Sequence, residues 1–263
     1  MARGSLGNVL RLIEAESENI SVEQQFLSDL KRAIEIQNQN SGRKPSQTYK
    51  PSSMNCIRNM WYQVTGADQD DGTTPYTLVG ICNSGSDIHV RIQTAVAYMK
   101  ECGIDCEYIN VADFVTSRNL TDIEVVSQQG METKLFHKTL NMSFLCDGII
   151  RYKGKYYILE LKSEGSNKFW ARKGVDTKHY NQGISYSIAF GLDDVLFVYI
   201  SRDSLDMKAY MFTPTDDMKQ NLVGTIDACE QYRKNGTVPP IPENIDKRNC
   251  EYCAYRLRCR AEI

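Results

Sequence analysis

A strong net charge is absent from this sequence. Its 31 Lys and Arg residues are nearly balanced by 33 Asp and Glu residues, giving a net charge of −2 over 263 residues. Without a protein-wide positive field, the chain can hold a nucleic acid only through local basic patches. The sequence also has no apolar run long enough for a membrane helix or a secretion signal, no internal repeat and no low-complexity tract. We therefore expect no membrane partner and a cytoplasmic location, in the host cytoplasm if the chain is phage-encoded.

Cysteine, by contrast, is abundant, with nine residues beside only three histidines and two tryptophans. The pattern Cys250-x₂-Cys253-x₅-Cys259 lies near the end of the sequence, and Cys56 lies far upstream. In a chain with no secretion signal, this usage favours a reducing compartment and metal ligation over disulfide bonds. Spacing alone does not separate a tetrahedral zinc site from an iron–sulfur site. Either one would tie residue 56 to the C-terminal segment.

A short hairpin is predicted between Asp147 and Lys162. Two apolar, β-rich runs flank Lys153-Gly154, which is the pattern of a two-residue turn. With that turn, Asp147 faces Glu160 across the ladder with Cβ atoms roughly 5 Å apart. Lys162 follows two residues later and so lies on the same face. Two opposed carboxylates repel each other unless a cation lies between them, and hard oxygen ligands favour Mg²⁺ or Mn²⁺. A bulge at Gly154 would shift this register by one residue.

Two predicted helices carry further polar candidates. Gln182 and Tyr186 are i,i+4 neighbours on a helix that Asp176 or Thr177 can cap and that ends before Gly191. His89 lies on a helix expected to start near Ser86. A core tyrosine beside a polar residue, and a packed histidine, are the alternative interpretations of these two features.

In chain order, Asp147, Glu160-x-Lys162 and Gln182-x₃-Tyr186 resemble the core motifs of the PD-(D/E)XK nucleases. His89 upstream resembles the helical histidine of their RecB-like branch. Cys56 with the C-terminal cysteines resembles the iron–sulfur subset of that branch, which includes AddB-type subunits and exonucleases of CRISPR adaptation. The resemblance implies an α/β fold, in which a mixed central sheet flanked by helices forms a restriction-endonuclease-like core with a cysteine-rich C-terminal cap.

The same resemblance implies roles for individual residues. His89, Asp147, Glu160 and the carbonyl of Leu161 would hold Mg²⁺ or Mn²⁺, while Lys162 would orient water or stabilise developing charge. Gln182 and Tyr186 would position the strand or the groups around the metal. Cys56, Cys250, Cys253 and Cys259 would hold a [4Fe–4S] cluster, with Zn²⁺ as the alternative. Glu124 is a weaker acidic candidate, because a surface glutamate fits its position equally well.

Basic residues near the hairpin suggest a path for DNA. Lys168, Arg172, Lys173 and Lys178 surround Phe169 and Trp170, and such mixed cationic and aromatic sets suit single strands or ends. A second basic set surrounds the cysteines and comprises Lys247, Arg248, Arg256, Arg258 and Arg260. Solvated loops are the alternative interpretation of both sets.

The chain is predicted to divide into a helical arm with a linker (1–48) and a nuclease domain (49–263) that includes the cap formed by 56 and 250–259. The arm contains an amphipathic helix over 21–37 and a polar linker over 38–53, and could contact a protein partner. Further expected elements are strands near 122–128, 132–138, 194–201 and 207–213, helices near 86–100 and 110–117, and a helix ending before Gly236.

These features favour a metal-dependent DNA nuclease for recombination, repair or DNA processing. The resemblance favours an exonuclease that acts on ends or single strands, while endonuclease action and either polarity stay open. The alternative is a nuclease-like scaffold that binds nucleic acid or protein and has a purely structural metal–sulfur site.

Overall fold

The computed structural model describes residues 21–40, 46–70, 74–243, 245–251 and 253–262. The chain divides into two compact units, Met1–Arg43 with Asp71–Asn83, and Lys44–Asp70 with Ser84–Ile263. Parts of the predicted arm, residues 1–20 and 41–45, lie outside the described residues. The predicted division at residue 48 stays a prediction. No helix in the described ranges is both long enough and apolar enough to cross a membrane.

Two long helices differ at one end from the sequence expectation. Helix α2 (Val22–Asn40) starts where Ser21 and Gln24 exchange hydrogen bonds between side chain and backbone, as predicted for a capped start. It extends three residues into the expected linker. Helix α4 (Tyr76–Tyr98) starts directly after Pro75, ten residues before the expected start at Ser86. Its first turns contain Gly, Asn and Ser, which are weak helix formers and concealed this extension.

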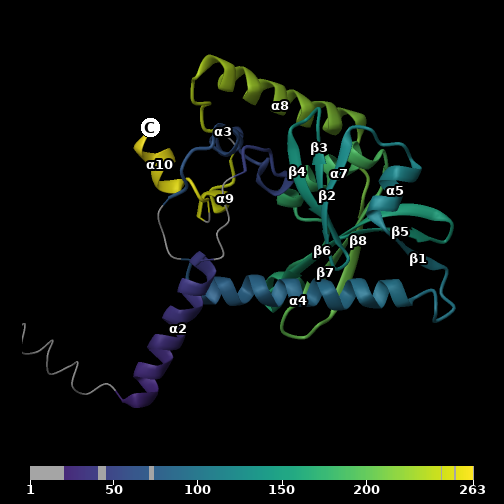
Figure 1. The fold of residues 1–263 in the computed structure, drawn as a ribbon, viewed down its shortest axis with the longest axis horizontal. Helices are drawn as coiled ribbons and strands as arrows, with labels where there is room; N and C mark the ends of the chain where they lie inside the picture. Colours follow the sequence, from purple (N-terminus) through teal and green to yellow (C-terminus); the bar gives the residue numbers. More distant parts are fainter. Residues whose placement is uncertain (1–20, 41–45, 71–73, 244, 252, 263) are drawn as a thin grey trace, which may run out of the picture. The chain divides into compact units, whose positions relative to one another are not determined.

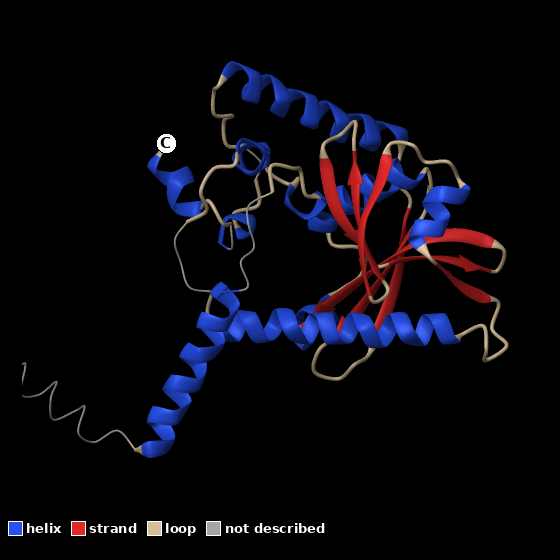
Figure 2. Cartoon of the chain, in the orientation of Figure 1, coloured by secondary structure: helices blue, strands red, loops and turns tan. Residues whose placement is uncertain are grey.

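The second unit contains a five-stranded mixed sheet and a three-stranded sheet (Figures 1 and 2). The five-stranded sheet has the spatial order β1 (Cys106–Ile109), β5 (Gly148–Tyr152), β6 (Lys155–Glu164), β7 (Val195–Ser201) and β8 (Met207–Phe212). The pair β6–β7 is parallel and the other described pairs are antiparallel. The antiparallel three-stranded sheet comprises β2 (Ile123–Gln129), β3 (Glu132–His137) and β4 (Met142–Cys146).

The remaining described elements of this unit are helical. They are η1 (Pro51–Ser53), α3 (Ile57–Thr65), α5 (Val111–Ser117), α6 (Ser166–Ala171), η2 (Thr177–His179), α7 (Tyr180–Phe190), α8 (Asp216–Asn235), α9 (Arg248–Glu251) and α10 (Arg256–Ala261). A mixed central sheet flanked by helices is thus confirmed, consistent with the expected restriction-endonuclease-like core.

The predicted hairpin register is confirmed for β5 and β6. Lys153 and Gly154 form the two-residue turn. Their φ values of +49° and +79° are the positive values that both central positions of this turn type need. Pairing runs from Tyr152 with Lys155 to Gly148 with Leu159, without a bulge at Gly154. The ladder stops there, so Asp147 does not face Glu160 as a paired residue. Asp147 instead lies where the chain leaves β4 in one sheet and enters β5 in the other.

Strand alternation gives the five-stranded sheet two apolar faces. On one face, the strand side chains pack into a hydrophobic core cluster with Ile184 and Ala189 of α7; they are Ile149, Ile158, Val195, Phe197 and Tyr199. The other set packs with Ile88 and Ile92 of α4, and comprises Ile150, Leu159, Leu161 and Ile200. Glu160 and Lys162 alternate in phase with Ile158, so their side chains share the face that α7 covers.

Candidate active site

Asp147 is held rigidly at the junction of the two sheets. Its backbone carbonyl accepts a hydrogen bond from Gln93 Nε2 (2.7 Å) and lies 2.9 Å from the Tyr108 hydroxyl. Its Oδ2 accepts from the backbone amide of Leu161 (2.7 Å). The carboxylate is buried, and its second oxygen, Oδ1, lies 3.2 Å from His89 Nδ1. The side chain therefore has a fixed direction and one oxygen directed at His89.

His89 lies between two carboxylates. Its Nδ1 is 3.2 Å from Asp147 Oδ1 and 3.6 Å from Glu132 Oε1. Burial alone would lower the pKa of His89, but its interactions with Asp147 and Glu132 outweigh that effect and raise the pKa to about 10. One ligand atom from each of these three residues lies within 4.8 Å of the other two. A divalent cation bound here would take the place of the imidazolium proton, so binding would release it.

Glu132 was not foreseen from the sequence. It begins β3 and is partly exposed, whereas the acidic candidate Glu124 is an exposed residue of β2. No motif spacing links residue 132 to residues 89 or 147. The link is tertiary, because the Tyr108 hydroxyl lies within 2.9 Å of the carbonyls of both Met131 and Asp147.

Glu160 is a buried carboxylate with one unpartnered oxygen. Its Oε1 accepts from Gln182 Nε2 (2.7 Å) and Lys162 Nζ (2.5 Å). Its Oε2 is buried and has no hydrogen-bond partner among the described residues. Burial raises the pKa of Glu160 to about 7, with Asp147 adding repulsion that the Lys162 charge partly offsets. A buried, unpartnered carboxylate oxygen is costly in a polypeptide alone and suits a cation ligand.

Gln182 and Tyr186 support Glu160 from helix α7. The Gln182 amide nitrogen donates to both Glu160 and the Tyr186 hydroxyl (2.8 Å), which itself donates to the Leu145 carbonyl (2.8 Å). Both side chains are buried. This i,i+4 pair therefore holds the Glu160 carboxylate in place from the α7 side.

Leu161 contributes backbone groups on the same side. Its amide bonds to Asp147, and in a strand the carbonyl of a residue lies on the same side as its amide. Because β5 pairing ends at Leu159, this edge of β6 is open to other partners. One imidazole, three carboxylates and an available carbonyl form a donor set that fits Mg²⁺ or Mn²⁺.

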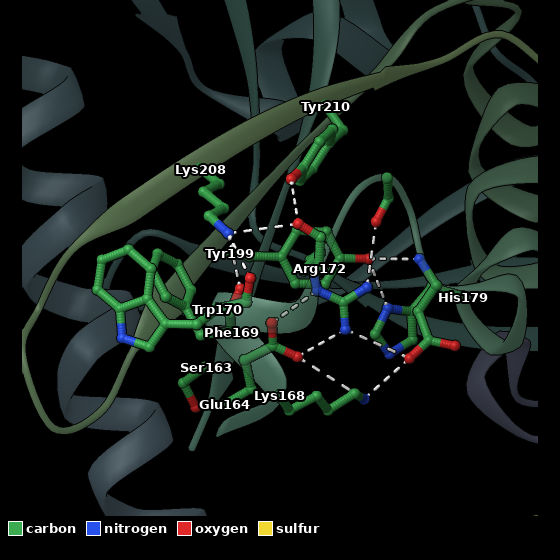
Figure 3. Close-up of polar contacts among 12 residues, drawn as sticks. Ser163, Glu164, Lys168, Phe169, Trp170, Arg172, His179, Tyr199, Lys208 and Tyr210 are labelled. Carbon is green, nitrogen blue, oxygen red and sulfur yellow. Dashed lines mark hydrogen bonds and ion pairs between the residues drawn. The ribbon is translucent and has the colours of Figure 1, made fainter. Parts of the chain in front are cut away.

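Arg172, expected at the DNA path, is instead buried within the protein (Figure 3). Its guanidinium makes two 2.6 Å bonds to Glu164, lies 3.4 Å from Asp176, and sits 3.9 Å from the centroid of the Tyr199 ring. The side chain is 6% exposed, because the planar fork of arginine matches the buried carboxylate. Arg172 is therefore not placed to meet a phosphate.

The three lysines expected at the DNA path are more exposed to solvent than Arg172. Lys168 is half-exposed and lies 2.8 Å from Asp176, while Lys173 and Lys178 are exposed. Phe169 is buried in the core and Trp170 is 60% exposed. The ammonium of Lys208, not foreseen from the sequence, lies over both rings and donates to the Phe169 carbonyl (Figure 3).

The four expected cysteine ligands line one cavity of about 620 Å³. Cys56 lies at the N-terminus of α3, and Cys250, Cys253 and Cys259 come from the C-terminal segment. Burial raises the pKa of the Cys56, Cys253 and Cys259 thiols, and their mutual repulsion adds to it. Arg256 and Arg260 also line this cavity, and the Arg248 side chain lies outside the described part of the chain. The four thiols thus share one cavity, which by itself does not identify a metal.

No protein-family model and no curated protein matches the chain. Among solved structures it is similar to SSO0001, at 14% identity over 90% of this chain and 98% of that chain, with a TM-score of 0.49. It is also similar to the alkaline exonuclease LHK-Exo from Laribacter hongkongensis, at 10% identity over 73% of this chain and 90% of that chain, with a TM-score of 0.43. A complex of LHK-Exo with dAMP gives 11% identity and the same TM-score. At such identities these are similarities of fold alone.

Proposed function

We propose that this protein is a metal-dependent DNA nuclease that hydrolyses phosphodiester bonds. The observation that carries the proposal is the cluster of His89, Glu132 and Asp147, whose ligand atoms lie within 4.8 Å of one another. Beside it, buried Glu160 interacts electrostatically with Asp147 and His89, and its Oε2 lacks any described partner. In a purely structural role, the imidazolium of His89 and the ammonium of Lys162 would offset only part of the burial cost and repulsion of the three carboxylates, because the pKa of Glu160 stays raised beside them. A cation-binding role removes that repulsion and satisfies the unpartnered oxygen.

The chain's own groups define the chemistry of this site. His89, Glu132, Asp147, Glu160 and the Leu161 carbonyl would hold Mg²⁺ or Mn²⁺, which supplies Lewis-acid stabilisation of the phosphate and acidifies bound water. Lys162 is 22% exposed and donates to Glu160, so its ammonium lies at the edge of the buried cluster. There it can orient the attacking water and stabilise charge that develops on phosphate oxygens. Gln182 and Tyr186 fix the direction of Glu160.

Within this proposal the enzyme acts as an exonuclease on single strands or ends. Exposed Lys173 and Lys178 would contact phosphates, and exposed Trp170 offers a face for base stacking. We further propose a [4Fe–4S] cluster on Cys56, Cys250, Cys253 and Cys259, as in the RecB-like iron–sulfur nucleases, with Zn²⁺ as the alternative. The cavity that these residues share supports a bound metal group of either kind.

The test is digestion of end-labelled single-stranded and double-stranded DNA in Mg²⁺ or Mn²⁺. Asp147→Asn and Glu160→Gln keep side-chain volume and should abolish cleavage while DNA binding in Ca²⁺ persists. Glu124→Gln is the matched control, because this carboxylate is exposed and outside the cluster. Digestion by either site variant at the wild-type rate would overturn the assignment. If the protein is instead a scaffold, the wild-type protein should bind DNA but not cleave it.

A further inference from the structure

His179 occupies a position on the catalytic face that the proposed chemistry does not use. It ends η2 and directly precedes α7, the helix that carries Gln182 and Tyr186. Its ring stacks nearly parallel to Phe197 (centroids 6.2 Å apart, 13°) and to Tyr199 (5.8 Å, 23°). These contacts fix the plane of the imidazole over strand β7.

The hydrogen bonds around Tyr199 set the tautomer of His179 (Figure 3). The Tyr199 hydroxyl accepts from the backbone amide of Asp176 (3.1 Å) and lies 2.9 Å from His179 Nδ1. Tyr199 is fully buried, and His179 Nδ1 is the one acceptor for its hydroxyl proton among the described residues, so the hydroxyl donates to Nδ1. The ring hydrogen of His179 therefore sits on Nε2. Burial and the nearby charges of Lys162 and Lys178 lower the pKa of His179 to about 2, which keeps the ring neutral.

The strand register places this ring beside the catalytic candidates. In the parallel β6–β7 ladder, Phe197 pairs with Glu160 and Tyr199 pairs with Lys162. His179 stacks on Phe197 and Tyr199, so it lies one strand away from Glu160 and Lys162. Its Nε2 has no hydrogen-bond partner among the described residues, and it is not one of the enclosed atoms that lack a partner. Nε2 is therefore not fully enclosed, although most of the ring is buried.

We propose that His179 Nε2–H donates a hydrogen bond to a phosphate oxygen of the bound nucleic-acid strand, beside Lys162. This inference rests on the proposed nuclease function. Tyr199 is then a positioning residue, because it acts through His179 and holds the proton on the nitrogen that faces the strand. This contact would come from a neutral group, whereas the proposed phosphate contacts of Lys173 and Lys178 come from charged groups. A neutral donor strengthens binding without releasing a counterion, so its loss leaves the salt dependence of binding unchanged.

The tautomer is tested directly on the full-length protein by NMR of labelled imidazole rings. The sequence has only three histidines, so single His89→Gln and His137→Gln variants assign the His179 signals. We expect a neutral His179 with its hydrogen on Nε2. Tyr199→Phe keeps the stacked ring but removes the hydroxyl, and should yield a mixture of tautomers. A wild-type His179 with its hydrogen on Nδ1 overturns the inference.

The phosphate contact is tested with two variants of His179. His179→Phe keeps the stacking and removes the donor, and should weaken single-stranded DNA binding and raise KM for cleavage by roughly tenfold, the usual effect of losing one hydrogen bond to a charged group. The slope of affinity against salt should not change, whereas Lys178→Ala should reduce it. His179→Gln places an amide N–H near the Nε2 position and should recover part of the affinity, which also guards against a folding defect in the first variant.

The outcomes separate this inference from the proposed function. Wild-type cleavage that His179→Phe matches in both KM and binding overturns the phosphate contact alone. A wild-type protein that neither binds nor cleaves DNA in Mn²⁺ overturns the proposed function and the strand contact together. Equal loss of binding in the Phe and Gln variants also overturns the contact, because a donor at that position would then make no difference.

Discussion

Replacement of Arg172 by methionine should destabilise the protein strongly. The change removes the cation that makes two 2.6 Å bonds to Glu164 and covers the ring of Tyr199. Glu164 is only 7% exposed, and among the described residues its carboxylate would keep just Lys168, 3.7 Å away, as a partner. Removing one member of a buried ion pair costs about 3–5 kcal/mol, and the remaining Lys168 contact favours the lower end, about 3 kcal/mol.

Urea unfolding of the full-length protein measures this change. With a slope of roughly 3 kcal/mol per molar urea, a loss of 3 kcal/mol lowers the midpoint by about 1 M. The double variant Arg172→Met/Glu164→Leu is the control. It removes both charges, so it should recover most of the loss, because an apolar pair of similar volume is often as stable as a buried ion pair. Arg172→Lys should fall between wild type and Arg172→Met, since an ammonium cannot make both bonds.

One outcome would show that Arg172 contacts DNA rather than Glu164. If Arg172→Met unfolds at the wild-type urea concentration while the salt slope of DNA binding falls by about one, the guanidinium contacts a phosphate instead of Glu164. Unchanged stability of Arg172→Met, with destabilisation of the double variant, would also contradict the ion-pair argument.

Three further predictions concern the proposed metal ligand Glu160, the cysteines and the exposed lysines. Burial raises the pKa of Glu160 to about 7, so the folded state holds this proton more tightly than the unfolded chain does, and metal-free protein should lose stability as pH rises from about 5 to 7. The Tm advantage of Glu160→Gln over wild type should therefore be larger at pH 8 than at pH 5, and an equal advantage at both would contradict the shift. Cys56→Ala should lower the Tm and solubility of an anaerobically purified brown protein. Colourless wild-type protein with stoichiometric zinc would refute the iron–sulfur cluster but keep a metal-bound link between Cys56 and the C-terminal cysteines. Lys173→Ala/Lys178→Ala should reduce the slope of DNA affinity against salt by about one for each phosphate that no longer meets a lysine, and an unchanged slope would place the strand elsewhere.

Local signals in the sequence determined the elements that carry the site. The β5–β6 register follows from the apolar alternation around Lys153-Gly154, because a two-residue turn permits one pairing. The spacing of Gln182 and Tyr186 likewise predicted that both lie on one face of α7, since residues four apart are helix neighbours. Such features depend on residues close in the chain, so periodicity and turn chemistry are enough to predict them.

Tertiary structure alone decided which side chains meet. Glu132 joins His89 and Asp147 because the chain changes sheets at Asp147, a change that no local pattern encodes. Arg172 has the same sequence context as the exposed lysines, yet the packing of its loop against β6 and β7 buries it on Glu164 and Tyr199. His179 gains its place beside Lys162 only through the parallel pairing of β6 with β7. In each case the partners are distant in sequence, so composition and spacing identify the charged residue but not its counterpart.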